Sequence, residues 1–410
     1  MSGSRERHRA RNVLVVGQVA MALVLLVSAG LMIRTFQALR TVEPGFTDAQ
    51  HLQVMRISIP DSLVAEPERV VRMQNEIMNK LAAIPGVEST AFASEMPMEG
   101  YDSAWDEIYA EDKVPSKGEI APLRLYKYVS PDFFRTAGTR LVAGRELTWT
   151  EVYGLRPVVM ISENLAREMW GTPSAAVGKR VREFSSMPWH EVIGVVQDAR
   201  ENGVQEKAPE IVYWPSMMAN LYGPGPLGAI RTVTFAIRSE RAGTEGFLGE
   251  VRQAVWSANS NLPLASVRTM QEVYNKSMAR TSFTLVMLGI AGAMALTLGI
   301  IGIYGVISYT VSQRKREIGI RLALGAQGGD VLQMVLRQGA KMAVAGVAIG
   351  IGAALGLTPL MTSLLFGVTA RDPQTFAGVA VLLMFVALLA SYFPARRATR
   401  VDPMVALRHE

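Results

Sequence analysis

Residues 313–326 read QRKREIGIRLALGA, and two long apolar runs, Thr281–Ser312 and Met342–Ala370, lie on either side of them. Each run is long enough to cross a bilayer as a helix, because a helix rises about 1.5 Å per residue and the hydrocarbon core is about 30 Å thick. The segment between the runs is therefore predicted to be a short basic helix at one membrane surface.

This short helix has two different faces. Glu317 precedes Arg321 by four residues, the order and spacing that favour an ion pair on a helix. Ile318, Leu322 and Gly325 line one face. We predict that this apolar face contacts a partner. An ordinary basic loop with an unpartnered apolar stripe is the alternative.

The next residues predict where this helix ends and where another begins. Gly325 and the pair Gly328–Gly329 are expected to stop the helix, because glycine readily adopts the conformation that ends one. Asp330 is expected to cap the following helix, because a short acidic side chain can accept a free backbone N–H there.

The same stretch resembles the cytoplasmic signature of the FtsX-like permeases of ABC transporters. The nearest branch is the MacB type, whose permeases carry a large extracytoplasmic core domain between the first two spans. In that family this segment is the coupling helix that docks on the ATPase subunit. The resemblance therefore implies a partner-binding site that consists of Arg316, Glu317, Ile318, Gly319, Ile320, Arg321, Leu322, Leu324, Gly325 and Ala326.

The composition excludes several classes of site. The chain has 410 residues, too many for one ordinary domain, and 49% of them are hydrophobic. It has no cysteine, so neither a disulfide nor a thiolate metal site is possible. Its four histidines are scattered and match no ligand spacing of a zinc site.

The net charge of +6 is unevenly distributed. Residues 35–280 hold 26 Lys and Arg against 30 Asp and Glu, a balance of −4, and the remainder holds 16 against 6, a balance of +10. The basic excess flanks the apolar runs, which is typical of the cytoplasmic loops of membrane proteins. It argues against nucleic acid as a partner.

A first membrane span is predicted over residues 12–34, after a basic N-terminus at residues 1–11. The arginines of that N-terminus place it in the cytoplasm by the positive-inside rule. A signal peptide cleaved near Ser28–Gly30 is the alternative. We expect the span to be retained, because Leu31–Ile33 continue the apolar run.

Residues 35–280 are predicted to form a soluble α+β domain on the outer side. Strands are expected where apolar residues alternate or cluster, at 52–59, 87–93, 157–161, from 178 onward, and at 191–196 and 231–238. Helices are expected from Pro67, from 130, over 163–170 after a Ser162 cap, over 247–258, and after a Thr269 cap. Residues 138–145 are expected to form a loop.

This region resembles the MacB-type core domain. The resemblance rests on turn glycines and core apolar residues, at Ser130–Phe134, Gly144–Arg145, Asn164–Ala166, Gly178–Arg180 and Val192–Val196. Together with the coupling signature it extends over nearly the whole chain.

Three further spans are predicted, at 281–312, 342–370 and 374–395, with a cytoplasmic coupling helix and linker at 313–341 and a cytoplasmic tail at 396–410. Two glycine pairs of the third span, Gly346–Gly350 and Gly352–Gly356, have a spacing that allows close helix contact. We therefore predict an α-helical membrane protein with four transmembrane helices and an α+β extracytoplasmic domain between the first and second. It is expected in a bacterial inner membrane, with both termini in the cytoplasm.

We find no group of residues arranged for catalysis, and we predict that the chain is not an enzyme and holds no cofactor. A G-x-x-x-x-G-K-[ST] phosphate loop is absent, since Gly178–Arg180 lacks both the earlier glycine and the hydroxyl residue. The apolar runs contain no Asp, Glu, Lys, Arg or His, which argues against ion-coupled transport. Arg337 and Lys341 are expected to lie at the inner membrane edge.

Two functions are compatible with these features. The resemblance implies a permease subunit of an ABC transporter, which couples ATP hydrolysis on a separate ATPase subunit to movements of the extracytoplasmic domain for efflux or extraction. The alternative is an ATPase-independent, membrane-anchored receptor or scaffold. The expected partners are the ATPase, a second permease copy or paralogous half, a periplasmic adaptor and membrane lipid.

One feature differs from the MacB type, in which the ATPase is fused ahead of the first span; here about a dozen residues precede it. The start also resembles the second half of duplicated permeases, in which two four-span units are fused. A stand-alone half, a homodimer subunit and part of a longer product are the alternatives. The substrate class stays open among drugs, peptides, lipids and lipoproteins.

Overall fold

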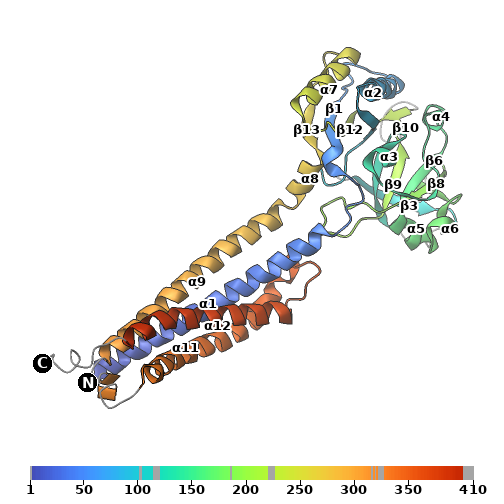
Figure 1. Cartoon of the computed structure of the whole chain (residues 1–410). Coiled ribbons are helices and arrows are strands. Elements are labelled where there is room, and N and C mark those ends of the chain that lie inside the picture. The colour runs from blue at the N-terminus through green and yellow to red at the C-terminus, as the bar shows by residue number, and fades with distance from the viewer. Residues whose placement is uncertain are drawn as a thin grey trace. The chain divides into compact units, whose positions relative to one another are not determined.

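The computed structural model divides the chain into two compact units (Figure 1). The first consists of residues 1–41 and 280–410, and the second of residues 42–279. The structure describes residues 2–100, 104–113, 121–184, 187–219, 227–314, 317–318, 320–321 and 327–399. As predicted, the second unit is inserted after the first long helix.

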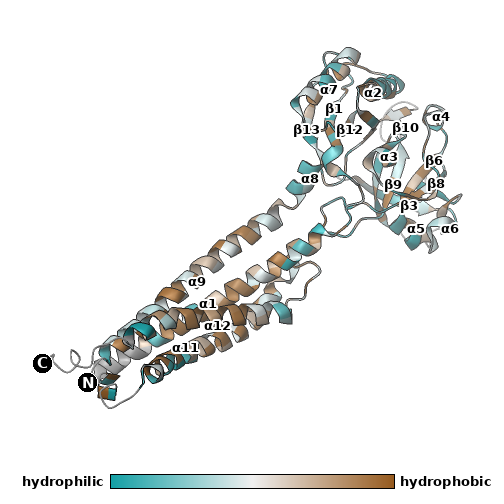
Figure 2. Cartoon of the chain, in the orientation of Figure 1, coloured by the Kyte–Doolittle hydropathy of each residue, from teal (hydrophilic) through white to brown (hydrophobic). Residues whose placement is uncertain are grey.

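Four long helices form the first unit: α1 (Ser2–Arg40), α9 (Ala279–Gln313), α11 (Gly328–Leu357) and α12 (Pro373–Ala398). Each contains a stretch that is long and apolar enough to cross a membrane, and within the described ranges these four are the only such helices. Figure 2 shows hydrophobic colouring along all four. The predicted combination of four apolar helices with an inserted α+β domain is confirmed.

The first helix is the central one of this unit. In α1, 44% of the apolar stretch is buried, against 22% to 28% in the other three helices. α1 packs along α11 and α12, which also pack against each other. All four helices contribute to one core, which includes Leu23, Val27, Ile307, Ala343 and Ala387.

Two glycines of α11 let α1 approach closely. A Cβ atom on Gly346 would lie 2.7 Å from Cβ of Val19, and one on Gly350 would lie 2.9 Å from Cβ of Leu23. The first glycine pair, whose spacing allows close helix contact, is therefore in close contact with α1. The second pair makes none, because Cβ atoms on Gly352 and Gly356 would meet no atom of the described chain within 4 Å.

The third long helix differs from its predicted range of 342–370. α11 begins at Gly328, within the predicted linker, and a short 3-10 helix, η2 (Thr358–Leu364), follows it. Gly328 and Gly329 therefore begin a helix instead of ending one. Asp330 is not the cap residue; it accepts the N–H of the cap residue, Gln327, at 3.1 Å, because a carboxylate three residues inside a helix can reach back to the cap.

The second unit has two lobes. In the sheet lobe, four antiparallel strands follow the order β13 (Ala265–Thr269), β1 (Leu52–Ser58), β12 (Thr232–Ser239) and β2 (Val87–Ala93). The pairing is antiparallel throughout. Helices α2 (Pro67–Ala82) and α7 (Glu245–Ala258) share a core with these strands that contains Ile77, Phe92, Phe235 and Phe247.

In the ring lobe, six strands close on themselves. Their order is β4 (Leu123–Val129), β3 (Ala104–Ala110), β7 (Arg180–Glu183), β8 (His190–Val196), β6 (Val158–Ser162) and β9 (Ile211–Pro215). A parallel pairing of β9 with β4 completes the ring. Each of the six strands therefore pairs with a neighbour on both sides, and the ring has no free edge strand. The core of this lobe contains Val159, Val192 and Trp214, which pack together with α5 (Glu163–Trp170).

Short elements complete the second unit: η1 (Ala49–His51), α3 (Phe133–Ala137), β5 (Leu141–Gly144), α4 (Trp149–Tyr153), α6 (Pro173–Ala176), β10 (Met217–Ala219), β11 (Leu227–Ala229) and α8 (Met270–Ser277). β5 pairs with β8 through Gly144 and Gly194, two glycines of the sequence motifs. Gly144 has a positive φ of 78°, and a Cβ on it would lie 2.9 Å from Cα of Gly194. The close approach of these strands therefore requires glycine.

Most elements predicted for this unit are present, and one prediction is wrong. Thr269 caps α8 by accepting the N–H of Glu272 at 3.3 Å, as predicted. Ser162 is the N-cap residue of α5, as predicted, but its side chain makes no cap bond, because its Oγ accepts the N–H of Ile211 in β9 at 2.8 Å. Residues 141–144, predicted as loop, form β5 because β8 offers them a pairing partner.

Candidate functional site

The predicted coupling segment lies between α9 and α11. Its described residues Glu317, Ile318, Ile320 and Arg321 are helical. The other predicted site residues, Arg316, Gly319, Leu322, Leu324, Gly325 and Ala326, lie outside the described residues.

Ile318 attaches this segment to the long helices on either side. Its side chain is 3% exposed and packs with Val331 of α11 and Val311 of α9. Its N–H donates to the carbonyl oxygen of Arg314 at 2.9 Å. The prediction that the apolar face contacts a partner is therefore wrong at Ile318, because this chain's own helices already cover it. The described residues of the other face, Glu317, Ile320 and Arg321, remain open to a partner.

That other face is exposed and carries charge. Arg321 Nη2 donates to Glu317 Oε1 at 2.7 Å, which confirms the predicted ion pair, and the side chains of Arg321 and Glu317 are 51% and 48% exposed. Arg314 Nε lies 4.0 Å from Glu317 Oε2. Ile320 is 42% exposed beside them. An apolar side chain bordered by charged ones is suited to a docking surface, which has an apolar centre and a polar rim.

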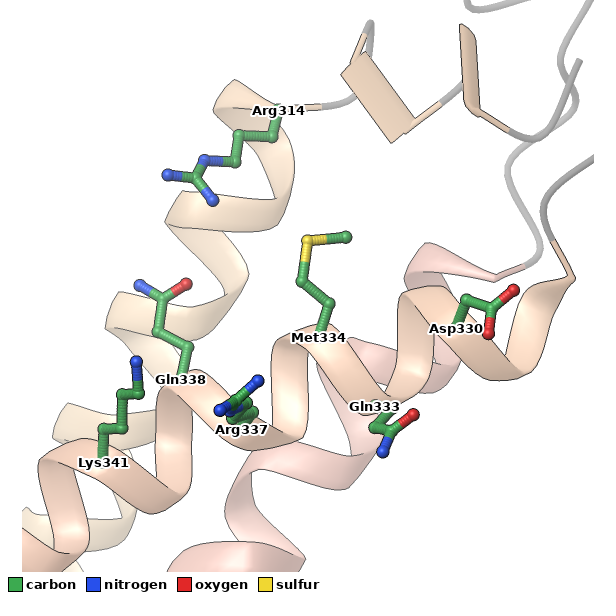
Figure 3. A pocket seen from close by; sticks show the side chains of 7 residues that line it. All are labelled: Arg314, Asp330, Gln333, Met334, Arg337, Gln338 and Lys341. Carbon is green, nitrogen blue, oxygen red and sulfur yellow. The ribbon is translucent and has the colours of Figure 1, made fainter. Parts of the chain in front are cut away.

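A hollow of about 540 Å³ lies next to this segment, where the end of α9 faces the start of α11 (Figure 3). It is lined by Arg314, which directly follows α9, and by Asp330, Gln333, Met334, Arg337, Gln338 and Lys341 from α11. Figure 3 shows Met334, Gln338 and Lys341 extending from α11 toward the last turn of α9, where Arg314 extends toward them. Arg321 Nη1 lies 3.6 Å from Met334 Sδ, so the hollow borders the coupling segment.

Tyrosines and arginines gather at the same end of the helical unit. Arg397 Nη1 donates to the hydroxyl of Tyr304 at 3.1 Å. The Arg11 guanidinium lies 4.4 Å from the ring centroid of Tyr309. Such a belt is typical of a membrane–water interface, where amphipathic side chains keep their polar ends in water.

A second group of charged residues, which the sequence did not predict, is buried in the second unit. Lys127 of β4 is 1% exposed and forms an ion pair with Glu201, which is 3% exposed. Glu99 accepts hydrogen bonds from Arg268 at 3.1 Å and from Thr234 Oγ1 at 2.7 Å. These residues come from β4, β12, β13 and the loops after β2 and β8, so the group lies where the two lobes meet.

Burial perturbs the titration of several groups in this unit. It raises the pKa of Glu201, and the nearby charge of Lys127 opposes that rise. It raises the pKa of Glu95 in the same way, again against Lys127. Burial lowers the pKa of His190 in β8. Across the described residues, no three His, Asp or Glu side chains are placed to hold a metal ion. Glu201 and Glu99 are instead held in ion pairs with Lys127 and Arg268.

Two known families match the chain. Residues 13–243 match the MacB-like periplasmic core domain, and residues 289–403 match the FtsX-like permease C-terminal family. The first match covers most of α1 and of the second unit. The second covers α11, α12 and most of α9, together with the coupling segment.

Curated proteins are similar over most of this chain. The macrolide export ATP-binding/permease protein MacB 1 of Aeromonas hydrophila is 28% identical over 322 residues, which are 72% of this chain and 45% of that protein. The protein MacB of Escherichia coli is 22% identical over 324 residues, 78% of this chain and 49% of that protein. The chain thus spans about half the length of the curated relatives it matches.

Among solved structures, the periplasmic region of MacB from Actinobacillus actinomycetemcomitans is similar to part of this chain. The aligned region makes up 59% of this chain and 97% of that structure, with 14% identity and a TM-score of 0.36. The match to the MacB-like core domain alone extends over more than half of the chain, and the permease match follows it. The chain belongs to the MacB type of the FtsX-like permeases.

Proposed function

We propose that this chain is the permease subunit of an ABC transporter and that ATP is hydrolysed on a separate ATPase subunit. The observation that supports this most directly is the exposed surface of Glu317, Ile320 and Arg321. It lies on a segment that Ile318 attaches to both α9 and α11. A partner that moves this segment therefore acts on two long helices at once.

α9 links the coupling segment to the second unit. It is continuous over 35 residues and begins after a single residue that separates it from α8. Nucleotide-dependent closure of the ATPase pair displaces the coupling segment, and α9 carries that displacement to the second unit. Because the docking surface makes different contacts in the two ATPase states, it can shift the equilibrium between two conformations of the permease.

In this proposal the chain transmits movement and does not form a pore. The names of the relatives combine ATP binding, permease and macrolide export in one protein. For this chain we propose only the general class of function, that of an exporter that drives efflux or extraction of substrate on the outer side. Residues 1–410 contain no phosphate loop, and in this proposal the ATP-binding part lies on a partner chain.

The proposed orientation has both termini in the cytoplasm and residues 42–279 outside a bacterial inner membrane. It puts the basic segments 5–11, 314–321 and 396–400 together on the inner side. The second unit is then free to contact a periplasmic adaptor, and a second copy or paralogous half completes the transporter.

Single cysteines test this orientation, because the chain has none of its own. The side chain of Asp61 is 80% exposed, and Arg396 lies in the last turn of α12. A membrane-impermeant maleimide is expected to label Asp61→Cys in intact spheroplasts and Arg396→Cys only after permeabilisation. The reverse pattern would overturn the orientation.

Charge reversal tests the docking surface. Within the helix, the Glu317–Arg321 pair contributes only about 0.2–0.5 kcal/mol, so Glu317→Lys should not affect folding. Losing one partner of a charge pair buried at an interface costs about 2–5 kcal/mol, more than tenfold in binding. Glu317→Lys and Ile320→Asp should therefore each lower co-purification of the ATPase more than tenfold.

Glu6→Lys is the matched control, because it makes the same charge change before the first span. If Glu317→Lys and Ile320→Asp retain as much ATPase as this control, the docking surface is wrong. If the unmodified chain itself retains no ATPase, the receptor or scaffold function is favoured.

A further inference from the structure

We propose that the hollow beside the coupling segment binds the phosphate group of an anionic membrane lipid. The proposal rests on Arg314, which directly follows α9, and on Arg337, Gln338 and Lys341 of α11. It rests on the proposed orientation, which places this hollow at the cytoplasmic surface of the membrane.

The hollow has an excess of positive charge. Arg314, Arg337 and Lys341 line it with a single carboxylate, that of Asp330. That carboxylate already accepts the N–H of Gln327 at 3.1 Å. Within the part of the chain that the structure describes, the side chains of Arg337 and Lys341 make no ion pair or hydrogen bond. The two cations are therefore available to an anion from outside the chain.

The positions of the cations suit a phosphate. Arg337 and Lys341 are four residues apart on α11, so they lie on the same side of the helix. Arg314, just after the end of α9, extends toward α11 (Figure 3). A guanidinium group can donate two parallel hydrogen bonds to a phosphate, while an ammonium and an amide add single donors. The cavity of about 540 Å³ is within the range of about 300–1,000 Å³ that ligand pockets occupy.

The surroundings favour a lipid over a free phosphate. Lys341 directly precedes the apolar run that begins at Met342. An apolar crevice borders the hollow and shares Arg314, Met334 and Gln338 with it; its other lining residues are Ile307, Thr310, Val311, Glu317, Ile318 and Val335. The crevice itself holds only about 20 Å³, so an acyl chain would lie along the exposed apolar side chains that follow Lys341 on α11, such as Val344, which is 54% exposed. Basic pockets between helices at the cytoplasmic side are typical sites for anionic head groups.

The test measures lipid retention by the purified full-length chain in detergent, by native mass spectrometry, with phosphatidylglycerol and phosphatidylcholine as probes. The test variant is Arg337→Gln/Lys341→Gln. The control, Arg396→Gln/Arg397→Gln, removes two cations from the last turn of α12, outside the hollow. The parent and the control should retain phosphatidylglycerol at least tenfold over phosphatidylcholine. The test variant should lose that preference by tenfold or more.

A titration with inorganic phosphate separates the two sources of phosphate. Retention of phosphatidylglycerol without binding of inorganic phosphate supports the lipid. If inorganic phosphate binds the parent chain as tightly as phosphatidylglycerol does, and the test variant loses this binding, the assignment to a lipid is wrong. If the test variant and the control retain the lipid equally well, the proposed binding site is wrong. No ATPase is present in these measurements, so the result does not depend on ATPase docking.

Discussion

Arg34 of α1 forms an ion pair with Asp372, the N-cap residue of α12, across 338 positions of sequence. Arg34 Nη2 also donates to Gln374 Oε1 at 2.9 Å, and Asp372 Oδ2 accepts the N–H of Thr375 at 2.9 Å. The first helix, which precedes the inserted second unit, is thereby joined to the last. The helical unit holds its two chain segments together without using the second unit.

Asp372→Ala should destabilise the helical unit by about 1–2 kcal/mol, because it removes an N-cap as well as the partner of Arg34. Arg34→Ala should have a smaller effect, since its side chain is 39% exposed and exposed pairs contribute little. The thermal transition in far-UV circular dichroism measures the effect in detergent. Arg371→Ala, which removes the neighbouring exposed cation, serves as the control. If it lowers the thermal transition as much as Asp372→Ala does, the stabilising role of Asp372 as cap and ion-pair partner is refuted.

Gly346→Leu should separate α1 from α11, because even a Cβ atom at this position would overlap Val19. Forcing extra methylene groups into a packed contact costs about 1–3 kcal/mol. Gly352→Leu is the matched control, because its Cβ would meet no described atom within 4 Å. Thermal transitions of the two variants in detergent compare them directly. If both lower the transition equally, the close contact between α1 and α11 is not the cause.

Much of the helical unit could be predicted from the sequence, because length, apolar composition and flanking arginines depend only on neighbouring residues. Of the apolar face predicted for the coupling segment, Ile318 is described, and it packs against this chain's own helices. The periodicity that identifies such a face does not say whether α11 or another protein covers Ile318. The ion pair of Arg34 with Asp372 was also missed, because nothing local to either residue indicates the other.

The second unit shows the same limit. The buried strand β8 was predicted because Val192–Val196 is continuously apolar, whereas β4, which reads LRLYKYV, was missed because charged residues interrupt it. Lys127 sits in β4 at a buried position between Leu125 and Val129. Its burial depends on Glu201, 74 positions further along the chain. The sequence of β4 alone cannot supply that partner.

Lys127→Met should destabilise the second unit by about 3–5 kcal/mol, because it leaves the buried Glu201 without its partner. Changing both residues, in Lys127→Met/Glu201→Leu, should cost less than the single change, since no unpaired charge then remains. All six tryptophans lie in residues 42–279, so tryptophan fluorescence during urea unfolding reports on this unit alone. A double variant less stable than Lys127→Met would contradict the pairing.

The second unit should also respond to pH through His190. This residue is 6% exposed, its ring lies 4.9 Å from that of Trp214, and its Nδ1 lies 3.0 Å from the carbonyl oxygen of Pro188. Burial lowers its pKa below the ordinary value of 6.5, although the bond to Pro188 opposes this. Between the lowered pKa and 6.5 the unfolded chain therefore binds a proton that the folded chain does not, and stability falls as the pH falls through this range.

The buried carboxyl groups act in the opposite direction, so the contribution of His190 has to be isolated by substitution. The pKa values of Glu95 and Glu201 are raised above 4.5, so their contribution is lost as the pH rises through the raised values. His190→Phe keeps an aromatic ring beside Trp214 but cannot titrate. Between about pH 7.5 and pH 5.5, the urea midpoint of the parent should fall relative to that of His190→Phe, as measured by tryptophan fluorescence. A constant difference between the two midpoints would mean that His190 titrates equally in the folded and unfolded chains.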